Sequence, residues 1–341
     1  TCSAVAAAAQ EPAEVPSMGQ PCRSMPRSRR PSMTPSAYPM PKSPPPPKTP
    51  AKGGGVWVLT SPVSPEGRRV GVMEARILTW NLWWQFGPWR DRQEAILSTL
   101  KSEQPDIVFL QEVWAQEGGL DQAQWLADEM NMFVARTEGP WYDNGVSLGN
   151  AILSRWPIVS WEVHRLPDVT GAPSYRRAVV AHIETPFGRM WTVCTHLDYK
   201  FDASATRMAQ CEALCGIVSQ LRNDPEVELP VLLAGDFNAV PDSDEIRMMT
   251  GRSEPAVDGL VFTDMWEVAG EDTGFTWRRD NPYIEDSAWP NRRLDYLFVS
   301  WPRPRPIGNP TRMWLAGLET VGGVQPSDHA AVVADIRMVG E

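Results

Sequence analysis

Short apolar runs separated by turns recur from Ala75 onward, and they constrain the fold of this chain more than any other feature. Examples are ARILTWNL, DIVFLQE, AVVAHIE and PVLLAGDFN. Short runs rich in Val, Ile and Leu and bounded by Gly, Pro or polar residues are typical of buried β-strands. Further strands are predicted at NAILSRWPI, MWTVCTHL, RRLDYLFVS and AAVVADIRM.

Three segments show the three- and four-residue apolar spacing of an amphipathic helix. They are Arg90–Lys101, Asp121–Met130 and Ala203–Leu221, and the last is the clearest. Many strand-to-strand connections with only a few helices favour mixed sheets over one parallel sheet. We therefore expect an α/β (α+β) protein in which helices flank two facing sheets.

Residues 1–72 have a different composition. Fifteen of the 33 prolines precede Gly67, and residues 1–73 hold nine Lys/Arg against three Asp/Glu. Such a segment buries too little apolar surface to offset its chain entropy. We expect a disordered, basic, Pro-rich tail over residues 1–72 and one domain over residues 73–341. The tail could be a native interaction segment, or non-native sequence ahead of a start near Met73.

The remainder of the chain is acidic, with 39 Asp/Glu against 23 Lys/Arg. Such a domain is a poor non-specific binder of duplex nucleic acid, because non-specific binding depends on neutralising the phosphates. Acidic clusters can instead hold divalent cations. The five cysteines lack zinc-site spacing, and no apolar run reaches membrane-spanning length. We expect a cytoplasmic monomer without a transmembrane segment, with secretion left open.

Two polar motifs adjoin apolar runs in the second half of the chain. Asp236 and Asn238 flank Phe237 at the end of PVLLAGDFN, and alternation along a strand would put both on one face and Phe237 in the core. Together they could orient a water and donate to a phosphate oxygen; the alternative is an Asx-rich turn. Asp328 and His329 precede the last predicted strand, and they offer a hard-metal ligand and a group that titrates near neutral pH.

Four further polar residues lie at the ends of predicted strands. Glu112 closes DIVFLQE, and such a carboxylate suits Mg²⁺ or Mn²⁺. Asn81 ends the first strand, and His196 ends the MWTVC strand. Asp295 opens the RRLDYLFVS strand, where it could hold a histidine ring in one tautomer. Each of them alone has an ordinary interpretation as a surface or turn residue.

In this order and spacing, the motifs resemble the endonuclease/exonuclease/phosphatase superfamily (DNase I-like), in particular its small bacterial members. The resemblance covers nearly everything after the tail, and GDFN and SDH are its most specific parts. It implies a four-layered α/β/β/α sandwich of two mixed β-sheets, with the site at one edge where strand ends converge.

The resemblance also implies roles for the motif residues. Glu112 corresponds to the main ligand of a Mg²⁺ (or Mn²⁺) cofactor, with Asn81 and Asp328 nearby. Asp236 corresponds to the residue that positions or activates water, and the general base, Asp or His, is left open. The residues expected to hold or orient around the phosphate are Asn238, His196, His329 and Asp295, and those expected to bind substrate are Asn150 and Arg176.

The resemblance implies a metal-dependent hydrolase of phosphoester bonds, above all phosphodiesters, with nuclease-type activity favoured. Trp83 stands where exonuclease III-type AP endonucleases carry Asp, and His196 where they carry Tyr, so abasic-site repair is disfavoured. One alternative is a phosphatase or phosphodiesterase on a small-molecule or lipid phosphate. Others are a catalytically inactive binding module and a protein that acts through its basic tail.

Overall fold

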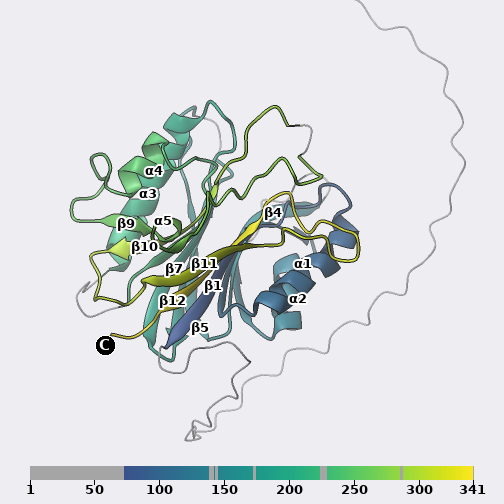
Figure 1. The fold of residues 1–341 in the computed structure, drawn as a ribbon, viewed down its shortest axis with the longest axis horizontal. Helices are drawn as coiled ribbons and strands as arrows, with labels where there is room; N and C mark the ends of the chain where they lie inside the picture. The colour runs from purple at the N-terminus through teal and green to yellow at the C-terminus, as the bar shows by residue number, and fades with distance from the viewer. Residues whose placement is uncertain are drawn as a thin grey trace, which may run out of the picture. The chain divides into compact units, whose positions relative to one another are not determined.

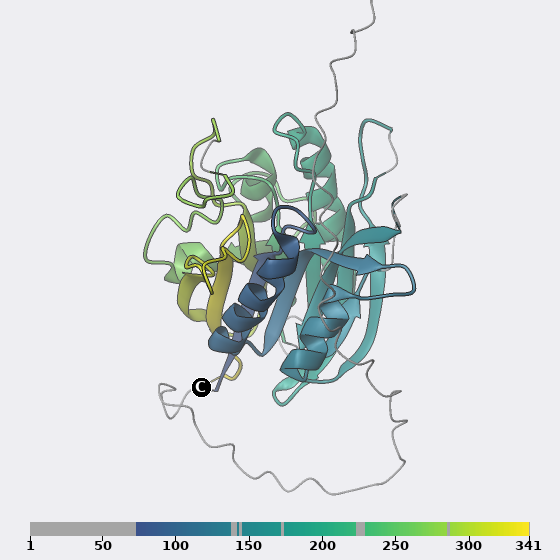
Figure 2. The ribbon, with the colours of Figure 1, turned by 90° about the vertical axis from the view of Figure 1, so that its right-hand side faces the viewer.

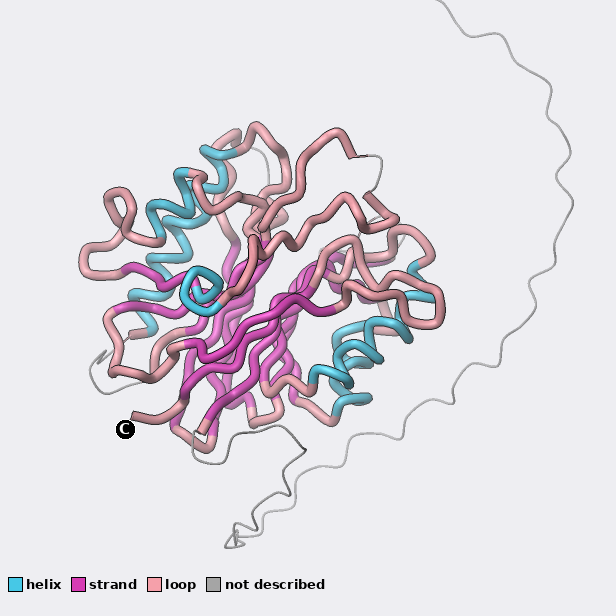
Figure 3. Tube along the Cα trace, in the orientation of Figure 1, coloured by secondary structure: helices cyan, strands magenta, loops and turns pink. Residues whose placement is uncertain are grey.

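The computed structural model describes residues 73–340 except 138–141, 143–144, 172–173, 223–228 and 285–286. The tail predicted over residues 1–72 lies outside the described residues and stays a prediction. Two β-sheets face each other, and helices cover their outer faces (Figures 1 and 3). The predicted sandwich of two mixed sheets is confirmed. In the described part of the chain, no helix is long and apolar enough to cross a membrane.

The first sheet has the strand order β11-β12-β1-β2-β4-β3. Strands β1 and β2 are parallel, and all other pairs are antiparallel. Helices α1 (Trp89–Glu103) and α2 (Gln122–Met130) lie side by side over its outer face (Figure 2). The strands are β1 (Glu74–Asn81), β2 (Ile107–Gln116), β3 (Phe133–Arg136), β4 (Val146–Ser154), β11 (Pro310–Ala316) and β12 (Ala331–Arg337).

The second sheet has the order β5-β6-β7-β8-β10-β9, and here β7 and β8 are the parallel pair. Helices α3 (Ser204–Leu221) and α4 (Asp244–Met249) pack on its outer face, and α5 (Met265–Ala269) packs against β10 and β11. The strands are β5 (Ile158–Arg165), β6 (Arg177–Thr185), β7 (Gly188–His196), β8 (Leu232–Asp236), β9 (Val261–Asp264) and β10 (Asp295–Trp301).

Alternation along the central strands explains why they are apolar on both faces. In β2, Ile107 and Phe109 point into the core between the sheets, whereas Val108 and Leu110 pack under α1 and α2. All four side chains are fully buried. Each such side chain contributes ~1.5–3 kcal/mol of hydrophobic stabilisation. The apolar runs of the sequence therefore correspond to strands with helices on one side and the second sheet on the other.

Each predicted helix and strand corresponds to a helix or strand of the structure, but the bounds of two predicted strands, NAILSRWPI and DIVFLQE, were wrong. NAILSRWPI was predicted as one strand, but β4 ends at Ser154 in the first sheet and β5 begins at Ile158 in the second. The Trp156 amide donates to the Ser154 hydroxyl at 3.0 Å and not to a neighbouring strand. Pro157 has no amide to donate to a sheet ladder. The single strand was therefore the wrong prediction, and the segment instead connects the two sheets.

The strand directions bring polar ends together at one edge. The parallel pairs β1–β2 and β7–β8 run toward this edge, and β10 and β12 start from it. In the register, His196 of β7 lies beside Asp236 of β8, and Asp236 lies opposite Asp295 of β10. His329 comes two residues before β12 begins.

Candidate active site

Asp236 lies at the centre of this edge and is 1% exposed. Its Oδ2 accepts a hydrogen bond from Asn81 Nδ2 at 2.9 Å, and its Oδ1 accepts one from the Asn238 amide at 2.8 Å. His196 Nε2 lies 3.5 Å from Oδ2. Because these partners come from β1, β7 and the turn after β8, the carboxylate is held from several sides in one orientation.

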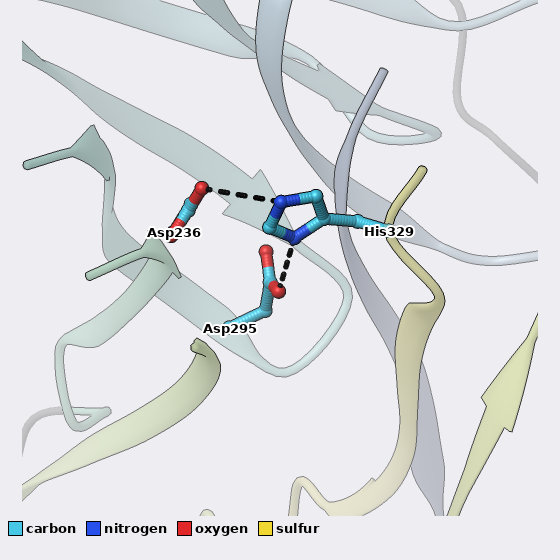
Figure 4. Close-up of side chains that lie close together, drawn as sticks. All are labelled: Asp236, Asp295 and His329. Carbon is cyan, nitrogen blue, oxygen red and sulfur yellow. Dashed lines mark hydrogen bonds and ion pairs between the residues drawn. The ribbon is translucent and has the colours of Figure 1, made fainter. Parts of the chain in front are cut away.

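His329 lies between two carboxylates (Figure 4). Its Nδ1 is 2.8 Å from Asp295 Oδ2, and its Nε2 is 3.9 Å from Asp236 Oδ2. The carboxylate of Asp295 therefore fixes the ring, as the sequence predicts for this pair, and it leaves Nε2 on the side of Asp236.

The loop that carries Asp328 and His329 is pinned to strand β1. Ser327 Oγ donates to the Asn81 carbonyl at 2.6 Å, and Trp80 Nε1 donates to the His329 carbonyl at 2.9 Å. Both bonds are buried, so the loop position depends on β1. The positioning roles of Ser327 and Trp80 could not be predicted from the sequence, because neither residue type signals such a contact.

Glu112 reaches the site through a β-bulge. The predicted strand end was wrong, because β2 continues to Gln116 and its register with β4 shifts between Leu110 and Val113. Glu112 has a φ of 55°, in the left-handed region. That conformation costs roughly 1–2 kcal/mol for a residue with a Cβ. Bulges re-aim side chains near active sites, and this one turns the Glu112 carboxylate toward the site.

The GDFN motif is a strand end followed by a turn. Phe237 is fully buried under α3 and α4, as predicted. Asn238 has a φ of 50°, so strand alternation does not explain its orientation, and that part of the prediction was wrong. The turn nevertheless keeps Asn238 beside Asp236, with its Nδ2 donating to the Leu197 carbonyl at 3.2 Å.

A cavity of about 750 Å³ opens over these groups. This volume is within the range of small-molecule and cofactor sites. Its floor is polar and its walls are largely aromatic, with three basic side chains. Floor residues are Asn81, Glu112, His196, Asp236, Asn238, Asp328 and His329. Wall residues include Trp83, Phe86, Tyr142, Tyr175, Tyr199, Phe201, Trp277, Arg176, Lys200 and Arg292.

The floor carboxylates have raised pKa values. Burial raises the pKa of Asp236 to about 6, and the charge of Asp295 adds to the effect. Burial raises the pKa of Asp328 to about 7, and it also raises that of Glu112. Several acids in a poorly solvated place disfavour one another's charged forms. The site therefore has an excess of negative charge that a cation would stabilise.

The two histidines are shifted in opposite directions. The pKa of His329 is raised well above its usual value, because the carboxylates of Asp295, Asp328 and Asp236 together outweigh the opposing effect of burial. The pKa of His196 is lowered well below its usual value by burial, with further contributions from Arg176 and His329. The surroundings therefore favour the charged form of His329 and the neutral form of His196, and such a division is typical of sites with distinct acid and base roles.

The chemistry of the floor fits a hard divalent cation. Glu112 Oε2 is buried and, among the described residues, has no hydrogen-bond partner. Glu112 also interacts with the Asn81 side chain. Its charge contributes to the raised pKa of Asp328. Carboxylate and amide oxygens are the ligands that Mg²⁺ prefers. The predicted trio of Asn81, Glu112 and Asp328 can therefore supply a Mg²⁺ or Mn²⁺ site.

A second group, Asp236, Asp295 and His329, has possible ligand atoms within 4.8 Å of one another. We favour the Glu112 trio over this group. His329 Nδ1 is already bonded to Asp295, and the nearby carboxylates raise the pKa of the ring well above its usual value, whereas a metal ligand must be a neutral imidazole.

The two predicted substrate-binding residues lie at different depths. Arg176 lines the main cavity, and its guanidinium lies 5.7 Å from the Tyr199 ring centroid. Asn150 is 4% exposed and donates from Nδ2 to the Arg177 carbonyl at 2.8 Å. The structure thus brings Arg176 to the site and places Asn150 behind it, where it supports the backbone beside Arg176.

Arg92 is a residue of the site's framework that the sequence analysis missed. It is fully buried in α1 and donates to five backbone carbonyls around the loop after Asn81. A signal was present, because Arg92 stands on the apolar stripe of α1 with Ala95, Ile96 and Thr99. From the sequence alone, an arginine at such a position is predicted to be exposed, because its carbonyl partners lie in other segments of the chain.

Two mixed sheets that bring carboxylates, amides and two histidines to one edge define an α/β sandwich with a hydrolase-type site. A family model described as "Endonuclease/Exonuclease/phosphatase family" matches residues 78–329. The chain belongs to this family, so the predicted resemblance is confirmed.

Individual relatives agree with this assignment. Tyrosyl-DNA phosphodiesterase 2 of Gallus gallus is 27% identical over 261 residues, which are 74% of this chain and 64% of the relative's length. An endonuclease/exonuclease/phosphatase from Beutenbergia cavernae has 24% identity and a TM-score of 0.59, over 77% of this chain and 71% of that one. D. rerio TDP2, complexed with single strand DNA product, has 21% identity and a TM-score of 0.60, over 77% and 99%. The solved structures show the shared fold.

Proposed function

We propose that this protein hydrolyses phosphodiester bonds in a nuclease-type reaction that requires Mg²⁺ or Mn²⁺. One observation carries the proposal. The buried carboxylate of Asp236 is held by Asn81 and faces two histidines, one of which is paired with Asp295. This combination provides a site for water next to donors for a phosphate.

Each group of the site has a separate role in this proposal. Asp236 accepts a hydrogen bond from the attacking water and orients it. The cationic His329 donates from Nε2 to a phosphate oxygen, and Asp295 keeps its ring in place. His196 and the side-chain amide of Asn238 add neutral donors. A cation bound by Glu112, Asn81 and Asp328 would polarise a phosphate oxygen and offset the charge that develops on it. Preorganised donors of this kind are often the largest contribution to catalysis.

The balance of charge favours a diester over a monoester. A phosphate monoester carries nearly two negative charges at neutral pH, and it would bring both to a floor already rich in carboxylates. A diester carries one negative charge and has an organic group on each side. The aromatic walls of the cavity can accommodate such groups. The similarity to a protein named a phosphodiesterase also supports this choice.

The test compares three substrates: bis(p-nitrophenyl) phosphate, p-nitrophenyl phosphate and a single-stranded oligonucleotide. Wild type, Asp236→Asn and the exposed control Asp258→Asn are assayed with Mg²⁺ or Mn²⁺ and then with EDTA. We expect both diesters to be cleaved, with a loss of ~10²–10⁴-fold in Asp236→Asn and no change in the control. Preferred cleavage of the monoester would favour a phosphatase instead. Full activity in Asp236→Asn or in EDTA would refute the proposal.

A further inference from the structure

An aromatic pair with an arginine against it lies at the mouth of the cavity. The rings of Phe201 and Trp289 are stacked, with centroids 4.1 Å apart and planes 23° apart. The Arg292 guanidinium carbon lies 4.6 Å from the Phe201 centroid and 4.7 Å from the Trp289 centroid. We call these three residues the rim platform. They come from the loop after β7 and from the loop before β10.

The rim platform is exposed although it is mostly aromatic. Phe201 is 52% exposed and Trp289 is 43% exposed. The Arg292 side chain has no carboxylate partner in the described part of the chain, although the domain is strongly acidic. Cation–π contacts hold the guanidinium without neutralising it. Two accessible rings and a guanidinium therefore stand together.

The backbone ties the rim platform to the catalytic floor. Arg292 and Trp277 exchange two backbone hydrogen bonds of 2.9 Å, and Trp277 forms a bridge to His329. Arg292 is thus two strand spacings from His329, roughly 10 Å. Phe201 and Arg292 line the same cavity as Asp236 and His329. A substrate longer than the group around the scissile phosphate would therefore reach the rim platform.

We propose that Phe201, Trp289 and Arg292 form a second subsite, which binds the nucleotide next to the scissile phosphodiester of a single-stranded polynucleotide. A base stacks on the exposed rings, and Arg292 pairs with the phosphate of that nucleotide. Stacking on aromatic side chains together with cationic contacts to the backbone is the general way in which proteins hold single strands. This inference rests on the proposed function, and it adds the substrate's length and strandedness.

Two features favour a nucleotide over a lipid surface. The rings lie against a guanidinium, a combination that suits a base and its phosphate. The acidic domain is also repelled by anionic membranes, and the same charge disfavours long duplexes. A single strand makes fewer phosphate contacts and can be held by one arginine and two rings.

The experiment uses bis(p-nitrophenyl) phosphate, a diester without nucleobases, as the reporter. Oligothymidylate is added as a competitor, and its inhibition constant is measured for wild type, Phe201→Ala, Trp289→Ala and Arg292→Gln. An abasic oligomer of equal length serves as a second competitor. The matched controls are Trp161→Ala and Arg189→Gln, which alter exposed side chains on β5 and β7 that do not line the cavity.

We expect the oligothymidylate inhibition constant to rise about 10-fold in each rim variant, in line with the contribution of one stacked base. Hydrolysis of the reporter without competitor is measured in each rim variant, so that any effect on the reporter itself is separated from the effect on oligothymidylate binding. The ring variants should bind the abasic oligomer as wild type does, whereas Arg292→Gln should weaken both competitors. Arg292→Gln should also reduce the slope of log affinity against log salt by ~0.7.

Unchanged inhibition constants in all three rim variants would overturn the inference while leaving the proposed function intact, since the reporter is still cleaved. If Phe201→Ala instead loses binding to phosphatidylcholine–phosphatidylserine vesicles and keeps its oligothymidylate affinity, the platform is a membrane contact and the inference is wrong. If wild type cleaves no substrate, the proposed function fails. Anisotropy with a labelled oligothymidylate then decides whether the same variants still lose binding.

Discussion

Replacing Arg92 with Met should destabilise the protein by loosening the loop that follows Asn81. The guanidinium donates five hydrogen bonds of 2.8 to 3.2 Å to backbone carbonyls. Met retains much of the apolar stem of Arg92 but offers no donor. The carbonyls belong to Leu82, Trp83, Trp84, Phe86 and Pro326.

The size of the expected destabilisation follows from the carbonyls that lose their hydrogen-bond donor. The bonds to Leu82 and Pro326 are fully buried, and the other three are partly accessible to water. A buried acceptor without a partner costs ~1–3 kcal/mol, so the two buried carbonyls together cost ~2–6 kcal/mol. The variant regains some stability because it no longer buries a charge, and this burial lowers the pKa of Arg92. We expect a net loss of ~2–4 kcal/mol.

The assay is urea unfolding, monitored by tryptophan fluorescence. Arg90→Met is the matched control, since Arg90 is exposed on the same helix and its guanidinium contacts only the Trp89 ring in the described structure, at 4.2 Å. It should lose less than about 1 kcal/mol. Arg92→Lys should fall between Arg92→Met and wild type, because a single ammonium cannot replace the planar fork. A free energy of unfolding for Arg92→Met within ~0.5 kcal/mol of wild type would refute the reasoning.

Three other predictions follow from the same geometry. Asp295→Asn should lower kcat ~10²–10⁴-fold with little change in melting temperature, because His329 loses the nearby carboxylate that most favours its charged form; steady-state kinetics and calorimetry check both. Gly235→Ala should unfold at clearly lower temperature, because an added Cβ would lie 1.9 Å from a carbonyl oxygen of β7; an unchanged melting curve would contradict this. In EDTA, the protein should lose stability as pH rises from about 4 to about 7, because burial raises the pKa of Asp328 from 3.8 to about 7 and the favoured protonated form is then lost. Asp328→Asn should flatten that pH profile.

Much of the site could be predicted because strand ends carry it. Asn81, His196 and Asp236 each end an apolar run, and Asp295 begins one. Once the strand directions are known, these ends must meet at one edge. The position of a polar residue at the end of an apolar run was therefore enough to identify residues that the tertiary structure brings together.

The missed features depend on contacts between distant segments. The bulge at Glu112 depends on pairing with β4, and nothing in the local sequence marks it. The division of NAILSRWPI depends on which sheet each half joins. Arg92 and Ser327 act through backbone carbonyls, which no side-chain pattern reveals. The positions of Phe201 and Trp289 against Arg292 likewise depend on two loops that are far apart in the chain.

The measurement that tests the account most directly is the rate of bis(p-nitrophenyl) phosphate hydrolysis as a function of Mg²⁺ concentration in wild type and Glu112→Gln. Glu117→Gln, an exposed position just past the end of the same strand, is the matched control. We expect Glu112→Gln to need at least ~10-fold more Mg²⁺ for half-maximal rate, in line with the loss of a ligand carboxylate, and the control to match wild type. Equal Mg²⁺ dependence in Glu112→Gln and wild type, or hydrolysis without any divalent cation, would contradict the account.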